Sequence, residues 1–401
     1  MPVLQDYNQF SGLHWETGSV RNHYAYRNVR APHTRQSYSE AMLLGVSGGI
    51  VMGYFSFAYE GYDPHARILT RNTFDPLNTL LGRLGVVQNL AQTSRSDIAA
   101  QNLVKSLEQD LPAIVWADMF SLPYNGLPYD EGMWGMMPVV VYGYDATSDQ
   151  VWIADRARAP LTISTIELAA ARGRVKKFKY RLLTLEPPDP DKLPGAVRKG
   201  IWDCINLFTE APPKGTKNNF GLAAYRWWAD LLLKPKARLS WEREFPAGAK
   251  MYAGLVSAFT DINTFGKDGN AERVLYADFL EEASQVLDNP ALVDVARLFR
   301  RSANAWDELS HLLLPDSEPL LGETRLLLLR RHHLFLENGG AALEDMQMTD
   351  ERLAEIKTQA ASGFPLNSAG VARLREELSQ QIMRIHDIEK DAVEALQKAM
   401  S

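Results

Sequence analysis

The proline-rich segment of residues 187–195, PPDPDKLPG, divides the chain into two parts with different sequence patterns. Its prolines and acidic residues disfavour a helix and favour an extended linker. Residues 1–186 mix helical and strand patterns, whereas residues 196–401 are almost entirely helical. Since 401 residues also exceed the usual size of one domain, the sequence predicts an α+β domain, a linker and an all-α helical domain with these boundaries.

Apolar segments after residue 110 predict an antiparallel sheet in the first domain. AIVWADMF and MPVVVYGYD are nearly all apolar, as expected of strands covered on both faces, and QVWIAD follows a polar hairpin turn. KKFKYRLLTLE is predicted as the last strand. Helices are expected over residues 17–27 and after the capping residues Ser39, Ser96 and Ser164, the last of which forms a capping box with Glu167.

The amphipathic segments of residues 196–401 predict a helical bundle. FGLAAYRWWADLLL, RVLYADFLEEASQVL and PALVDVARLFRRSANAWDELSHLLL all have helical periodicity. A bundle is the simplest packing for so many helices with one apolar face.

Composition limits the compartment and the partners. The net charge of −6 argues against nucleic acid, because phosphate binding needs a concentrated basic surface. No apolar run approaches the ~18 residues of a membrane span, and the first residues do not have the pattern of a signal peptide. Cys204 is the one cysteine, so no internal disulfide forms. We therefore expect a soluble, cytoplasmic protein.

Four motifs follow one another in an order typical of a known family. GLHWETGSVRNHY, SEAMLLGVSGGI, VWADMFSLPYN and VVVYGYD with VWIAD resemble the N-terminal domain of butirosin biosynthesis protein H, which is related to papain-like cysteine peptidases. GNAERVLYADFLEEA resembles the helical domain that follows in such proteins. The resemblance implies a papain-like fold for residues 1–186 and acyl transfer from a carrier protein to an amine during antibiotic assembly.

The chain departs from this family at the positions that carry the chemistry. The resemblance implies a His-Cys pair at the start of the first helix, where this chain has His14 and Trp15. Met137 stands where the family has the histidine that accepts the thiol proton, whereas Asp155 keeps the acidic position that orients it. Cys204 lies in an apolar helix of the second domain and is not expected to substitute. A covalent acyl-enzyme is therefore not expected.

Four residues remain as catalytic candidates, each with a structural alternative. Asp118, at the end of an apolar strand, either abstracts a proton or ties down the following turn. His14 either replaces the missing base or packs beside Trp15. Glu16 either acts as a weak base or only complements the positive end of the helix, and Asp155 either acts in the site or anchors a loop.

Further residues are predicted to contact a substrate. The backbone amides of the glycine-rich turn, GVSGG, either hold an anion or form a plain tight turn. Buried tyrosines either donate hydrogen bonds to substrate or serve the core. The predicted substrate-binding residues are Trp15, Ser47, Gly48, Gly49, Tyr124, Met137, Tyr142 and Tyr144. No metal site and no cofactor are predicted.

Three functions fit these residues. The first is an enzyme that closes a ring, such as a strained nitrogen ring of the aziridine type, on an amino substrate tethered to a carrier protein. The second is amide formation from a carrier thioester by proximity alone. The third is a non-catalytic partner of another biosynthetic enzyme. The expected partners are the carrier protein and either a partner enzyme or a second copy of the chain.

Overall fold

The structure, a computed structural model, describes residues 2–209, 218–264 and 269–401. Its contacts divide the chain into two compact units, neither of which is continuous in sequence. The first, here the α/β unit, contains residues 1–43, 75–193 and 331–348. The second, here the helical unit, contains residues 44–74, 194–330 and 349–401. The sequence had instead suggested one division near residues 187–195.

A six-stranded sheet forms the centre of the α/β unit. Its strands run in the order β3 (Gln88–Ala91), β8 (Leu182–Leu185), β4 (Ala113–Asp118), β5 (Met136–Asp145), β6 (Gln150–Ala154) and β7 (Leu161–Ile163). All neighbouring strands are antiparallel, which confirms the predicted α+β class and the β5–β6 hairpin. The last strand is shorter than predicted, because Lys179 and Tyr180 have φ values of 50° and 45°, which extended strands do not allow.

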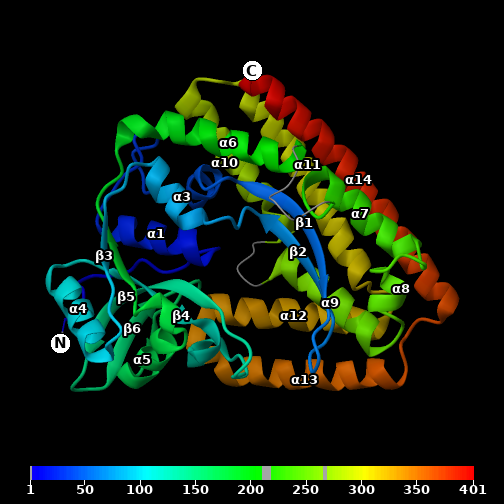
Figure 1. The fold of residues 1–401 in the computed structure, drawn as a ribbon, viewed down its shortest axis with the longest axis horizontal. Coiled ribbons are helices and arrows are strands. Elements are labelled where there is room, and N and C mark those ends of the chain that lie inside the picture. Colours follow the sequence, from blue (N-terminus) through cyan, green and yellow to red (C-terminus); the bar gives the residue numbers. More distant parts are fainter. Residues whose placement is uncertain (1, 210–217, 265–268) are drawn as a thin grey trace. The chain divides into compact units, whose positions relative to one another are not determined.

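Helices cover both faces of the central strands. All six residues of β4 are buried, and both α1 (Trp15–Tyr26) and α5 (Thr165–Gly173) pack against it. Within this unit, Figure 1 shows α1 on one side of the sheet and α5 with α4 (Ser96–Glu108) on the other. The unit also contains α3 (Pro76–Arg83) and the start of α2 (Glu40–Val46).

Two of the three predicted helix caps are present. The Ser164 hydroxyl accepts a hydrogen bond from the Glu167 amide, and the Glu167 carboxylate accepts one from the Ser164 amide, which completes the capping box. The Ser39 hydroxyl accepts a hydrogen bond from the Met42 amide at the start of α2. The prediction for Ser96 was wrong by one residue, since Arg95 is the N-cap and Ser96 begins the helix.

The predicted extended linker is partly helical, which corrects the sequence expectation. Residues Pro190–Lys192 form a short 3-10 helix and α6 begins directly after it, at Leu193. Prolines are tolerated here because the first turn of a helix needs no amide donors. The Asp189 side chain also accepts a hydrogen bond from the Asp191 amide and so caps the 3-10 helix.

Helices dominate the helical unit, as predicted. They are α6 (Leu193–Thr209), α7 (Gly221–Leu233), α8 (Trp241–Glu244), α9 (Ala249–Asn263), α10 (Arg273–Leu287), α11 (Ala291–Leu313) and α14 (Ser368–Met400). The unit boundary passes through α12 (Pro319–Asn338) and α13 (Leu343–Ser362).

A hairpin of β1 (Ile50–Phe57) and β2 (His65–Arg71) also belongs to the helical unit, although the sequence suggested the first domain. Its apolar face packs on helices: the Tyr54 ring stacks on Trp228 of α7 with centroids 5.4 Å apart. The Asp261 carboxylate of α9 accepts a hydrogen bond from the Ile68 amide at 2.9 Å. A strand pair too small to fold alone thus obtains its core from helices distant in sequence.

A buried ion pair connects several elements of the helical unit. Arg273 of α10 and Glu389 of α14 are both fully buried, with 2.7 Å between Nε and Oε1. Glu389 also accepts hydrogen bonds from Ser302 and Trp306 of α11, and Arg273 donates to the Val51 carbonyl of β1. Burial alone would raise the pKa of the Glu389 carboxyl, but the Arg273 charge and these donors hold that pKa below its ordinary value.

We expect Glu389→Gln to lower the free energy of unfolding by about 3–5 kcal/mol, because it leaves the Arg273 charge buried and unpaired. The difference should shrink as the pH falls through the lowered carboxyl pKa, since protonation removes the same interaction from the wild type. Urea denaturation measures both effects. Asp294→Asn, which breaks the exposed pair with Arg297, is the control and should change stability by less than about 1 kcal/mol. Equal effects of the two substitutions would contradict this account.

Candidate functional site

A small hollow lies at the start of α1 in the α/β unit. It contains about 160 Å³ of empty space, and no part of it is wide enough for a water molecule. Gly12 and Gly18 approach so closely that a Cβ atom on either would lie 2.9 Å from the other's Cα, so both positions require glycine. The hollow is lined by Gly12, His14, Trp15, Gly18, Ser19, Asn22, Ala154, Asp155 and Arg156.

An arginine packs on Trp15, at the position where the family resemblance leads us to expect a thiol. The Arg156 guanidinium carbon lies 4.0 Å from the ring centroid of Trp15, the first residue of α1, and 4.6 Å from that of Phe335. Trp15 and Arg156 are 6% and 7% exposed. Desolvated cation–π contacts of this kind contribute about 2 kcal/mol. The position therefore holds a packed indole and cation, with no nucleophilic atom.

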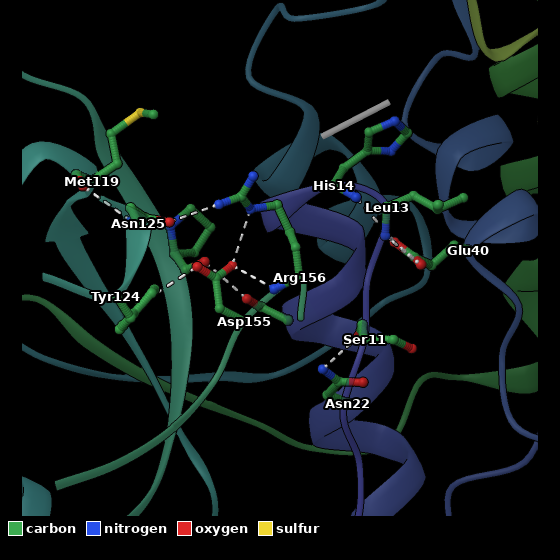
Figure 2. A network of polar contacts seen from close by, with 12 residues as sticks. Ser11, Leu13, His14, Asn22, Glu40, Met119, Tyr124, Asn125, Asp155 and Arg156 are labelled. Carbon is green, nitrogen blue, oxygen red and sulfur yellow. Dashed lines mark hydrogen bonds and ion pairs between the residues drawn. The ribbon is translucent and has the colours of Figure 1, made fainter. Parts of the chain in front are cut away.

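Asp155 orients this arginine. Its Oδ1 accepts hydrogen bonds from the backbone amide and, at 3.4 Å, from Nε of Arg156, and its Oδ2 accepts one from the Tyr124 hydroxyl at 3.2 Å (Figure 2). Asn125 accepts a hydrogen bond from Nη2 of Arg156 at 3.0 Å. Burial and the Asp155 charge raise the pKa of Tyr124 well above its ordinary value, so this hydroxyl remains a donor. Asp155 thus holds an arginine, whereas the family resemblance implies a histidine as its partner.

His14 lines the hollow, but its ring points away from the Asp155–Arg156 pair in Figure 2. It is the N-cap residue of α1, is 1% exposed, and places Nδ1 3.4 Å from the Thr17 hydroxyl. The Glu40 carboxylate accepts hydrogen bonds from the Leu13 amide at 2.8 Å and from the His14 amide at 3.3 Å. An internal carboxylate therefore occupies the electropositive region before the helix.

Asp118 lies at the end of β4, away from the hollow. It does not line the hollow, and its side chain is fully buried. Its oxygens accept hydrogen bonds from the Ser121 hydroxyl and the Gly135 amide, both at 2.7 Å, and Arg174 Nε lies 3.9 Å away. These contacts favour the alternative in which Asp118 ties down loops. Glu16 lies in the first turn of α1, as the helix-end alternative requires, and does not line the hollow either.

Three other predicted substrate contacts lie on β5 outside the hollow. The Tyr142 ring stacks on Tyr7 with centroids 4.3 Å apart, and burial raises its pKa to about 12. Met137 and Tyr144 are half-buried, opposite Ala117 and Val151 respectively. None of the three lines the hollow. Of the other predicted substrate contacts, Trp15 lines it, and Tyr124 donates a hydrogen bond to the lining residue Asp155.

The glycine-rich turn closes the C-terminal end of α2 in the helical unit. The amides of Ser47 and Gly49 donate to the Leu44 carbonyl, and the amide of Gly48 donates to the Gly45 carbonyl. Gly48 and Gly49 have φ values of 114° and 69°, which explains the choice of glycine. Because these amides are used and a helix C-terminus repels anions, the plain-turn alternative accounts for them.

Several residues of the site were not singled out from the sequence. Arg156 had a visible signal, since it directly follows Asp155 at the end of an apolar strand. Glu40 and Asn125 are polar residues of ordinary local context, and Phe335 comes from α12, almost two hundred residues away. Their roles depend on tertiary contacts that no local pattern records.

Thiol and metal chemistry have no candidate group in the part of the chain that the structure describes. Cys204 is fully buried in α6, and burial raises the pKa of its thiol to about 12. No group of three His, Cys, Asp or Glu side chains among the described residues is arranged to hold a metal ion. Among the same residues, no helix has the length and apolarity to cross a membrane.

The chain is therefore an α+β protein with a helical region. The family model for the N-terminal part of butirosin biosynthesis protein H matches residues 14–156, and a model for a domain of unknown function, DUF4872, matches residues 167–319. The chain belongs to a butirosin protein H-like family, which indicates a role in butirosin-type antibiotic biosynthesis. No curated protein matches the chain. The first match begins at His14 and ends at Arg156, both of which line the hollow.

We expect Cys204 of the folded protein to resist alkylation by iodoacetamide between pH 7 and 9, because the thiolate is the reactive form and burial disfavours it. In a denaturant the same thiol should react fully. Intact mass spectrometry measures the added group. Rapid labelling of the native protein at pH 7 would show an activated cysteine and contradict this assignment.

Proposed function

We propose that this protein is an enzyme of antibiotic-type biosynthesis that acts on an amino substrate tethered to a carrier protein, without a covalent enzyme intermediate. The reaction is an intramolecular ring closure that forms a nitrogen ring of the aziridine type. The observation that carries the proposal is the packing of Trp15 on Arg156, in the position where the family pattern has a thiol. Cys204, the one cysteine, is too deeply buried to replace it.

Ring closure fits the groups that remain. The substrate amine attacks the neighbouring carbon that bears an anionic leaving group, so that a C–N bond forms and a C–O bond breaks. The hollow has no room for a water molecule, so the substrate has to widen it on binding; the amine proton then passes to His14, which lines the hollow with its ring turned away from Arg156. The leaving group departs as an anion toward Arg156, whose Nη1 has no acceptor among the described residues. The carrier thioester is not broken, and confinement of the reacting atoms contributes about 7 kcal/mol or more.

The test uses the carrier protein loaded with an amino acyl group that has a sulfate or phosphate ester beside the amine. Intact mass spectrometry of the carrier should show loss of the corresponding acid and nothing else. His14→Gln is expected to slow this loss about 100-fold or more, because a proton acceptor is removed. His333→Gln, which alters an exposed histidine, is the matched control and should retain the wild-type rate. Full activity of His14→Gln would remove His14 from the mechanism.

The same assay separates the other two functions. Amide formation by proximity would free the carrier of its whole acyl group and add that group to an amine acceptor. A non-catalytic partner would bind the loaded carrier and leave its mass unchanged. The narrow hollow and the hydrogen-bonded carboxylates of Asp118 and Asp155 favour this last function as the second candidate.

A further inference from the structure

We propose that a basic–aromatic patch on the α/β unit, formed by Lys176, Lys177, Lys179, Tyr129 and Trp134, is a docking surface for an acidic face of the carrier protein. The identity of this partner rests on the proposed function, whereas the charge and geometry of the patch do not. The patch lies outside the hollow at the start of α1.

The charge of this segment is opposite to that of the whole chain. Residues 172–181, RGRVKKFKYR, contain six cationic and no acidic residues, while the net charge of the protein is −6. Lys176, Lys177 and Lys179 are exposed, and none forms an ion pair within the described residues. Unpaired cations that cluster on an acidic protein create a local positive potential, and this potential steers a negatively charged partner to the cluster.

Exposed aromatic rings lie beside these lysines. The side chains of Tyr129 and Trp134 are 59% and 49% exposed, although apolar surface of this size is normally buried. Lys177 Nζ lies 5.0 Å from the Trp134 ring centroid. Aromatic residues enriched at a site with a charged rim are typical of protein interfaces, where they bury area at small entropic cost.

Arg174 and Arg172 connect the segments that form the patch. The Arg174 guanidinium stacks over Tyr129 at 4.7 Å and donates to the carbonyls of Asp130 and Glu131. Lys179 and Tyr180 adopt left-handed backbone conformations, which the hydrogen bond from Arg172 to the Tyr180 carbonyl supports. A surface that is already ordered loses less entropy when it binds.

Asp118 connects the patch to β5, the strand that contains Met137. Its carboxylate accepts the Gly135 amide and faces Arg174, so it holds both halves of the patch. Gly135 follows Trp134 and comes two residues before Met137 in the sequence. The patch residue Trp134 is therefore close in sequence to Met137, the position where the family resemblance implies the proton-accepting histidine. Asp118 is then a positioning residue.

The patch suits an acidic protein partner better than a nucleic acid. Three lysines on a four-residue segment neutralise few phosphates, and nucleic acid affinity depends on many such contacts. The loop itself carries Asp130 and Glu131, which would repel a phosphate backbone. A protein partner with acidic and basic residues can match both signs.

The test is the affinity of the loaded carrier protein for the full chain, measured by isothermal titration calorimetry at low and high salt. The triple variant Lys176→Glu, Lys177→Glu, Lys179→Glu should bind about tenfold more weakly at low salt, with a smaller difference at high salt. The control, Lys199→Glu, Lys236→Glu, Lys250→Glu, changes the net charge equally at exposed lysines elsewhere and should stay within about twofold of wild type. Trp134→Ala should weaken binding at both salt concentrations.

The outcomes separate this proposal from the proposed function. Equal binding by wild type and the patch variant, or equal weakening in both triple variants, overturns the docking surface and leaves ring closure standing. Selective weakening without turnover supports the surface and contradicts the enzyme. Comparable binding of a short single-stranded oligonucleotide to the wild-type patch would overturn the choice of an acidic protein. Turnover of the same substrate on free pantetheine should be equal in wild type and patch variant.

Discussion

The contact between the Arg156 guanidinium and the Trp15 indole decides what chemistry remains at the start of α1. Such a contact needs the cation to leave water, and Asp155 and Asn125 supply the hydrogen bonds that make this possible. Asp155, which the family pattern pairs with a histidine, is used to hold the arginine. The carboxylate at this position is therefore paired with an arginine in this structure.

Each unit contains a buried arginine whose charge is compensated by a carboxylate. In the α/β unit Arg156 is stabilised by a carboxylate and two aromatic rings, and in the helical unit Arg273 is stabilised by Glu389 and backbone carbonyls. Such groups contribute to a unique arrangement because few other packings would satisfy all of their hydrogen bonds. Asp118 is a third buried charge, and its carboxylate accepts hydrogen bonds from the Ser121 hydroxyl and the Gly135 amide.

The sequence predicted individual helices and strands better than it predicted which of them pack together in one unit. Four strands of the sheet, β4, β5, β6 and β8, and the capping box of Ser164 and Glu167 follow from local patterns, and the structure confirms them. The short strands β3 and β7 were not predicted. No local pattern predicts the hairpin of residues 50–71, because its apolar face packs on α7 and α9, which are distant in sequence. Phe335 could not be found, because nothing local in α12 indicates a ring beside Arg156. Family order located Trp15 and Asp155, whereas the roles of Arg156 and Glu40 required tertiary contacts.

The central claim is that no acyl group is ever attached to this protein. The most direct measurement is rapid-quench intact mass spectrometry of the wild-type protein itself, mixed with excess acyl-loaded carrier and sampled from milliseconds to minutes. The account predicts that the protein keeps its unmodified mass at every time point while the carrier is bound or converted. A transient mass increase equal to the acyl group, located on any residue near α1, would contradict it.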